Sequence, residues 1–408
     1  DDDSGWRDGL RGMIESRMEN EAVRTAGNTK DLRTANCVAI RNIIASEGPL
    51  SRKQLAERTG LTAAAVTGIT ARLIQRGVLY EAGPGVPSGG RPSILLDIAP
   101  KVATSLAASI QKGAISSALF GIHGDILARR SSSLDTSSPE DAVEAISRQA
   151  EDMLTEAGMS RTDLSIASVA TAGLVNPYTG VIERSTNLGW HDEPIAKKLE
   201  AALRIPVLVE NISNAAALAE MAQGAGRGAK NLVYLSISAG IGAGVILAGH
   251  IYSGSHGYAG EVGHTPAVLS GGALCSCGRR GCLEAEYSAR AISVKLGNKD
   301  LEGLMDGPLS DDPTVRRVMD EASEAIGRTV AVLMSLYDPE VVILGGELAS
   351  VGGTFLEDVE RSAKSHCLGE IADKLEIRGS GLLKDTPMVG ARLIALRSLL
   401  NTQEWKKD

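Results

Sequence analysis

The first hydrophobic pattern along the chain repeats with the period of an α-helix. Between Asp31 and Ile44, apolar residues recur at helical spacing, at Leu32, Val38, Ile40, Ile43 and Ile44. Residues at this spacing share one face of a helix, and the pair Gly48-Pro49 ends it because proline cannot continue a helix. The pattern therefore predicts a helix across residues 31–44.

Two shorter helices, separated by a tight turn, are predicted next. Ser51 and Gln54 fit a capping box, in which two side chains satisfy free backbone N–H groups at the start of a helix. Gly60 ends that helix, and Thr62 can cap a third one. The inward face of the third helix carries Val66, Ile69 and Leu73. Two short helices joined by such a turn form a helix-turn-helix.

A loop rich in glycine and proline follows, with a strand-like segment on either side. The two segments are residues 77–81 and 93–96, and the loop runs from Gly83 to Pro92. Two strands around a flexible loop, directly after a helix-turn-helix, are typical of the wing of a winged helix.

Residues 99–408 alternate between β-rich and helical patterns, which predicts a pair of α/β domains. One uncharged run, from Asn231 to Gly249, has the length of a membrane span. Its four glycines include Gly240, Gly242 and Gly244, and they favour a strand-turn-strand instead. We therefore expect no membrane association.

Charge is distributed unevenly along the chain. The 408 residues carry a formal net charge of -8, which excludes a globally basic nucleic-acid coat. Residues 28–98, however, hold nine Lys and Arg against five Asp and Glu. An anionic partner is therefore expected at the N-terminal part. The length itself suggests two or three folded units.

The outward face of the third predicted helix consists of small residues, namely Ala63, Ala64, Thr67, Gly68 and Ala71. A helix that binds another protein normally presents large anchors, so a small helical protein-interaction domain is the less favoured alternative. Small side chains let a helix lie deep in the major groove, with methyl groups against thymine. In double-stranded DNA, the predicted contacts with the major groove are Thr62, Ala63, Ala64 and Thr67. The predicted contacts with the phosphates are Ser51, Arg52, Lys53 and Arg72.

Arg91, in the predicted wing, is assigned a separate role. It lies in the sequence Gly-Gly-Arg-Pro, which resembles an AT-hook. An arginine in this setting suits a narrow minor groove rich in A·T pairs, so we expect it to contribute to sequence preference.

Three of the five cysteines and one of the six histidines lie within nineteen residues, at His264, Cys275, Cys277 and Cys282. Thiolate and imidazole ligands suit Zn²⁺ in tetrahedral geometry, and four protein ligands leave no open position for an activated water. The sequence therefore predicts a structural zinc site. The alternative is a set of buried cysteines, or a disulfide, in a glycine-rich loop. The other two cysteines, Cys37 and Cys367, stand alone, which indicates a cytoplasmic protein.

The metal-loop sequence also resembles a known family. The segment Ala259–Gly263, His264 and the C-x-C-G-x-x-G-C-L-E run that ends at Glu284 are similar to the signature of the ROK family, which unites bacterial sugar kinases with sugar-responsive repressors. The predicted winged helix resembles that of ROK repressors, and the kinases of the family lack it.

The resemblance implies the fold class α/β, with an N-terminal winged helix-turn-helix followed by a two-lobed actin/hexokinase-like (ribonuclease H-like) ROK domain. The implied parts are an N-terminal helical extension (1–27), the winged helix-turn-helix with wing and linker (28–98), lobe 1 (99–212), lobe 2 with the zinc loop (213–385) and a C-terminal helix (386–408).

The resemblance also implies a sugar pocket, lined by Gly173, Thr186, Asn187, Asn211, Glu261, His264 and Glu284. Neutral amides and carboxylates can hydrogen-bond ring hydroxyls in pairs, which distinguishes a sugar from its epimers. His264 would serve twice, with one ring nitrogen on the metal and the other available to the sugar.

Individual positions separate the kinases of the family from its repressors. The resemblance implies that the kinases of the family carry an Asn-Asp pair where this chain has Asn211-Ile212. Isoleucine cannot accept a proton, so it cannot act as the catalytic base. The strand that binds nucleotide phosphates in these kinases carries the pattern Asp-x-Gly-Gly-Thr. The matching segment of this chain reads Ser109-Ile-Gln-Lys-Gly113. We therefore expect no catalytic residues and a DNA-binding regulator, a repressor of carbohydrate-metabolism genes, that responds to a sugar or sugar phosphate and acts as a homodimer or homotetramer.

Two other functions are left open by these patterns. One is an ATP-dependent sugar kinase that carries an accessory DNA-binding domain. The other is a DNA-binding scaffold that responds to no ligand.

Overall fold

The computed structural model describes residues 29–85, 92–100, 102–382 and 385–401. The predicted N-terminal extension (1–27) and Arg91 lie outside these residues. The chain divides into two compact units. Unit 1 comprises residues 1–169, 195–208 and 391–408, and unit 2 comprises residues 170–194 and 209–390.

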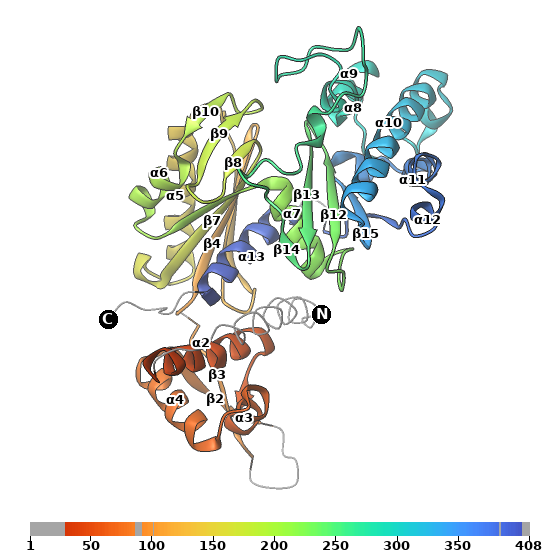
Figure 1. Cartoon of the computed structure of the whole chain (residues 1–408). Helices are drawn as coiled ribbons and strands as arrows, with labels where there is room; N and C mark the ends of the chain where they lie inside the picture. The colour runs from red at the N-terminus through yellow and green to blue at the C-terminus, as the bar shows by residue number, and fades with distance from the viewer. Residues whose placement is uncertain (1–28, 86–91, 101, 383–384, 402–408) are drawn as a thin grey trace. The chain divides into compact units, whose positions relative to one another are not determined.

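A winged helix forms the first part of unit 1. Its elements are α2 (Thr29–Glu47), β1 (Leu50–Ser51), α3 (Arg52–Thr59), α4 (Ala63–Gln75), β2 (Leu79–Pro84) and β3 (Ile94–Ile98). The strands form an antiparallel sheet in the order β1-β3-β2. The three predicted helices and the two wing strands are therefore confirmed (Figure 1).

Local sequence signals set the ends of the two short helices. The predicted capping box of Ser51 and Gln54 is present, and Gly60 ends α3 with a left-handed φ of 68°. Thr62 caps α4 by accepting a hydrogen bond from the Ala65 backbone N–H. Glycine adopts positive φ without steric cost, which explains its place at the turn.

The winged helix shares a hydrophobic core with the end of the C-terminal helix α13 (Thr386–Asn401). Val66, Ile69 and Leu73 are buried in this core, as are Leu396 and Leu399. The Asn42 side chain also donates to the Leu400 carbonyl at 3.0 Å. Carbonyls at a helix C-terminus have no partner within the helix, so this bond satisfies one of them.

The rest of unit 1 is built on a five-stranded sheet in the order β11-β7-β4-β5-β6, whose β11 extends into unit 2. The elements are β4 (Thr104–Gln111), β5 (Ala114–Phe120), β6 (Ile126–Ser133), α5 (Pro139–Glu156), η1 (Arg161–Asp163), β7 (Leu164–Thr171), α6 (Ile195–Leu203) and β11 (Val207–Asn211). Strands β4 and β5 are joined by the two-residue turn Lys112-Gly113.

Unit 2 contains a second five-stranded sheet in the order β14-β13-β12-β15-β16 and a three-stranded sheet in the order β10-β9-β8. Its strands are β8 (Leu174–Asn176), β9 (Val181–Ser185), β10 (Trp190–Glu193), β12 (Leu232–Ile237), β13 (Ile241–Leu247), β14 (His250–Ile251), β15 (Val341–Gly345) and β16 (Ile377–Gly379). The helices are α7 (Ile212–Gln223), η2 (Val262–His264), α8 (Leu283–Tyr287), α9 (Ala289–Lys295), η3 (Pro308–Asp311), α10 (Pro313–Tyr337), η4 (Glu347–Ser350), α11 (Phe355–His366) and α12 (Gly369–Ala372).

The uncharged run from Asn231 to Gly249 forms the antiparallel hairpin of β12 and β13, as predicted. Strand β12 also pairs in parallel with β15, so it is buried in the middle of the sheet. Within the part of the chain that the structure describes, no helix is both long and apolar enough to cross a membrane.

The compact units differ from the lobes that the sequence suggested. Residues 170–194 belong to unit 2 and residues 391–408 to unit 1, although the expected lobe boundary lay at residue 212. Contacts distant in sequence explain the first assignment, because the Tyr258 hydroxyl donates to the Glu183 carboxylate. Helix α13 begins at the expected residue 386, and its second half packs in the core of unit 1.

Candidate metal centre, ligand pocket and DNA-binding surface

The four predicted metal ligands come from three short elements of unit 2. His264 ends η2, Cys275 and Cys277 lie in a tight turn, and Cys282 immediately precedes α8. The turn is closed by the Cys275 N–H, which donates to the Arg279 carbonyl at 2.7 Å. Gly281 has a φ of 73°, and a Cβ there would lie 2.0 Å from the Val268 carbonyl oxygen. Only glycine allows this chain reversal.

The structure brings all four side chains together. Their ligand atoms lie within 4.8 Å of one another, with 3.6 Å between Cys275 Sγ and His264 Nδ1 and 3.6 Å between the sulfurs of Cys277 and Cys282. Two ligands on a tetrahedral zinc with bonds of about 2.3 Å are about 3.7 Å apart. A disulfide needs about 2.05 Å between sulfurs. The cluster can therefore hold a metal ion, and its cysteines are free thiols.

The thiols of the cluster have different electrostatic environments. Burial opposes ionisation of Cys277, but hydrogen bonds from Arg279 and the neighbouring cysteines lower its pKa to about 7. Burial and the neighbouring thiols raise the pKa of Cys282 to about 12. Thiolate is the form that binds metal, so a cation at the centre of the cluster would favour ionisation of both groups.

A pocket of about 590 Å³ lies beside the cluster in unit 2. Its lining residues are Gly173, Leu174, Arg184, Thr186, Tyr258, Glu261, His264, Thr265, Pro266, Cys277 and Arg279. Four of the seven expected sugar-pocket residues are among them, namely Gly173, Thr186, Glu261 and His264. The pocket is large enough for a monosaccharide or a sugar phosphate.

The other three expected residues lie next to this pocket and do not line it. The Asn211 amide donates to the Gly173 carbonyl at 2.9 Å. The Glu284 carboxylate accepts from the Ile241 backbone at 3.1 Å. A Cβ at Gly240 would lie 3.2 Å from the Asn187 amide nitrogen, so that side chain flanks the start of β13.

His264 connects the cluster with the pocket. Its Nδ1 faces the sulfur of Cys275, and its Nε2 lies 4.0 Å from the Glu261 carboxylate. Burial, together with the nearby charge of Glu284, raises the pKa of Glu261 to about 7. One ring nitrogen is thus directed to the metal ligands and the other to a pocket residue.

Seven of the eleven lining residues were not predicted for the pocket, and Arg184, Tyr258 and Arg279 are among them. Arg184 lies two positions before Thr186, a spacing that places both side chains on one side of an extended segment. That alternation was the available signal. Arg279 follows two residues after Cys277 and hydrogen-bonds its sulfur, a contact that cysteine spacing alone does not reveal.

The positions expected from the resemblance to separate kinases from repressors have local structural roles. Asn211 caps α7 by accepting from the Ser213 and Asn214 backbone, and Ile212 is the first residue of that helix. In unit 1, Gln111 ends β4 and donates to Ser109 at 3.4 Å. The glycine at position 244, in β13, is explained by packing. A Cβ at Gly244 would lie 2.1 Å from the Ser213 carbonyl oxygen.

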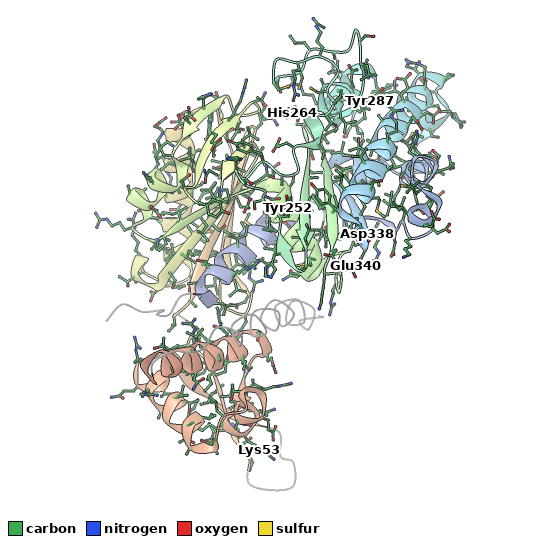
Figure 2. The ribbon with its side chains drawn as sticks, viewed as in Figure 1. Lys53, Tyr252, His264, Tyr287, Asp338 and Glu340 are labelled. Atoms are coloured by element: carbon green, nitrogen blue, oxygen red, sulfur yellow. The ribbon has the colours of Figure 1, made fainter. Side chains whose placement is uncertain are left out.

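The winged helix presents most of the predicted DNA contacts to solvent. Thr62, Ala63, Ala64, Thr67 and Arg72 are exposed. The Lys53 side chain is 86% exposed and lies 4.0 Å from Glu57 (Figure 2).

Two other predicted contacts are engaged within the domain. The Ser51 hydroxyl is buried and pairs with Gln54. Arg52 donates to the Thr70 hydroxyl at 3.2 Å and to Glu81 at 3.3 Å. Both residues therefore support α3 and the wing strand within the domain, and their contact with phosphates stays a prediction.

A winged helix joined to a sugar-kinase-like α/β domain defines a class of DNA-binding regulators. Comparison with known proteins supports the assignment of this chain to that class. The ROK family matches residues 108–398, and the winged helix-turn-helix DNA-binding family matches residues 39–80. The chain belongs to the ROK family. The fold class inferred from the sequence is thereby confirmed.

Individual relatives come from both branches of the family. The xylose repressor of Bacillus spizizenii is 26% identical over 362 residues, which cover 88% of this chain and 94% of the repressor. The glucokinase of Halalkalibacterium halodurans is 32% identical over 250 residues, which cover 57% of this chain and 76% of the kinase. A solved ROK transcriptional regulator, a homologue of the Escherichia coli Mlc protein, has a TM-score of 0.75 at 25% identity and covers 91% of this chain and 98% of its own.

Proposed function

We propose that this protein is a DNA-binding transcriptional repressor of carbohydrate-metabolism genes that responds to a sugar or sugar phosphate. One observation carries the proposal: a winged helix-turn-helix and a ROK domain with a pocket occur in the same chain. The xylose repressor is similar to the chain across both parts, whereas the glucokinase matches 57% of it.

Double-stranded operator DNA is the proposed partner of the winged helix. The exposed residues Thr62, Ala63, Ala64 and Thr67 suit base edges, and Lys53 and Arg72 suit phosphates. A symmetric dimer or tetramer would read half-sites one or two DNA turns apart. Such a regulator works in the cytoplasm, where its thiols stay reduced.

Zinc is the proposed metal, with a structural role. The cluster offers three thiolates and one imidazole, the ligand set of closed zinc sites, and such a set leaves no position for substrate or activated water. The metal would fix the orientation of His264 and the loop that contributes Cys277 and Arg279 to the pocket.

The pocket chemistry supports an effector with hydroxyl groups, with or without phosphate. Thr186 and Glu261 can hydrogen-bond hydroxyls, and Arg184 and Arg279 bring two guanidinium groups that suit phosphate. Ligand binding would favour one conformation of unit 2 and shift the population of DNA-binding molecules.

The proposed repressor is not an enzyme. Ile212 cannot act as a base at the start of α7. Gln111 at the end of β4 and Lys112 in the following turn stand in place of flexible glycines. A second candidate function is an ATP-dependent sugar kinase with an accessory DNA-binding domain. The observation in its favour is the similarity to a glucokinase.

A combined thermal-shift and DNA-binding experiment tests the proposal. Full-length protein is screened against hexoses, N-acetyl sugars and their phosphates, and against duplex DNA selected from a random library. We expect one ligand class to raise the melting temperature and to weaken binding to the selected duplex. Arg184→Gln, compared with Thr186→Ala, distinguishes sugars from sugar phosphates. Arg184→Gln should weaken the binding of phosphorylated ligands only. DNA binding that no sugar or sugar phosphate alters would support the ligand-independent scaffold instead.

A further inference from the structure

Gly68 lies in the middle of α4, on its solvent-exposed side, and no contact within the protein requires glycine there. Its backbone φ lies outside the left-handed region, and a Cβ at this position would meet nothing within 4 Å. Glycine is one of the poorest helix formers because its backbone loses the most conformational freedom on folding. Alanine would therefore form a more stable α4 without any clash in the protein.

Two other glycines inside long helices of the described residues, Gly327 and Gly390, have an evident structural reason. A Cβ at Gly327 in α10 would lie 2.4 Å from the Ser362 side-chain oxygen. A Cβ at Gly390 in α13 would lie 1.9 Å from the Ala215 carbonyl oxygen. In both cases glycine permits close approach of another part of the same unit. Gly68 also has a helical backbone, but no atom of the protein lies within 4 Å of the place where its Cβ would be.

The surface that approaches Gly68 therefore belongs to a partner, and the place of α4 in the fold indicates which one. The second helix of a helix-turn-helix enters the major groove of DNA. Ala64 and Ala71, one turn before and one after Gly68, are exposed, and so is Arg72. The chain thus presents two methyl groups and a cation around a position without a side chain.

We propose that Gly68 is a specificity-determining residue whose missing side chain leaves room for the 5-methyl group of a thymine in each operator half-site. The thymine methyl is the bulky apolar feature of the major-groove edge, and small apolar side chains contact it. Ala64 and Ala71 would flank the methyl group. This inference rests on the proposed function, because it needs α4 to read DNA.

The test compares Gly68→Ala with the parent chain on a duplex selected by the parent. The variant should melt about 1–4 °C higher, since alanine favours the helix. Its affinity for the selected duplex should fall at least about tenfold, the cost of placing a methyl where one already lies. Gly68→Ser should weaken binding in the same direction. Gly327→Ala is the matched control, and it should lower the melting temperature because the neighbour that it meets is Ser362 of the same chain.

Replacing each thymine of the duplex by deoxyuridine, which lacks the 5-methyl group, identifies the base. At one position per half-site, deoxyuridine should restore most of the affinity that Gly68→Ala loses. Loss of affinity with no position restored would overturn the thymine assignment. A Gly68→Ala chain that binds as tightly as the parent would overturn the whole inference and leave the proposed function intact. Failure of the parent to select any duplex would instead remove the proposed function.

Discussion

The Nδ1 atom of His264 lies 3.6 Å from the sulfur of Cys275, and this contact places a candidate metal ligand at the edge of the pocket. The other ring nitrogen of His264 faces Glu261 at 4.0 Å. A change in the candidate metal site should therefore alter the affinity of a ligand in the pocket, because the His264 ring is part of both.

We expect freshly purified protein to contain one zinc ion per chain and Cys277→Ser to lose most of it. The variant should also melt at a lower temperature and bind its effector at least about tenfold more weakly, since the loop positions His264. Elemental analysis and thermal shift measure these effects. Cys367→Ser is the control, because this cysteine lies outside the cluster and should change neither property. Metal-free parent protein would contradict the prediction.

Arg91→Ala should reduce affinity more for operators flanked by A·T pairs than for those flanked by G·C pairs. The reason is the attraction between arginine and a narrow minor groove. Lys53→Ala should weaken all sequences alike and reduce the salt slope by about 1, as expected for one phosphate contact. Titrations of both variants against paired operators at two salt concentrations check this. Equal losses on both operators for Arg91→Ala would remove the minor-groove role.

The parent chain should not produce ADP from ATP with any hexose above the background without sugar. Ile212→Asp should not create a kinase either, because the family resemblance implies that Ser109, Gln111 and Lys112 still stand where its kinases hold phosphate. A coupled assay of ADP formation compares the two chains. Sugar-dependent turnover by the parent would favour the kinase with an accessory DNA-binding domain.

Glu210 should make stability depend on pH. Burial raises its pKa above the ordinary 4.5, against the opposing effect of hydrogen bonds from the Asn214 side chain and the Asn211 backbone. Below pH 4.5 both folded and unfolded chains are protonated, so its contribution to stability is fully present. As pH rises from 4.5 to the raised pKa, the unfolded chain ionises while the folded chain keeps its buried carboxyl protonated, so stability is lost until the folded chain ionises too.

Melting temperatures of the parent and Glu210→Gln, measured between pH 4.5 and pH 8, check this dependence. The parent should lose stability relative to the variant as pH rises, whereas Glu144→Gln, at an exposed position, should track the parent throughout. Parallel curves for the parent and Glu210→Gln would show that Glu210 ionises normally in the folded chain.

The sequence by itself predicted those features that depend on neighbours along the chain. The capping box of Ser51 and Gln54, the turn at Gly60 and the β12–β13 hairpin each follow from residues a few positions apart. The four candidate metal ligands were also predicted from their spacing, because tight glycine turns bring nearby side chains together. The family resemblance added the α/β fold and four of the eleven residues that line the pocket.

Tertiary structure decided what depends on residues far apart in sequence. It placed Arg184, Tyr258 and Arg279 in the pocket and engaged Arg52 with Thr70 and Glu81. It also distinguished Gly68 from Gly327, which the sequence presents alike as glycines in helical patterns. The reason is physical: a glycine's role depends on what occupies the space of the missing Cβ, and that neighbour is set by packing across the fold.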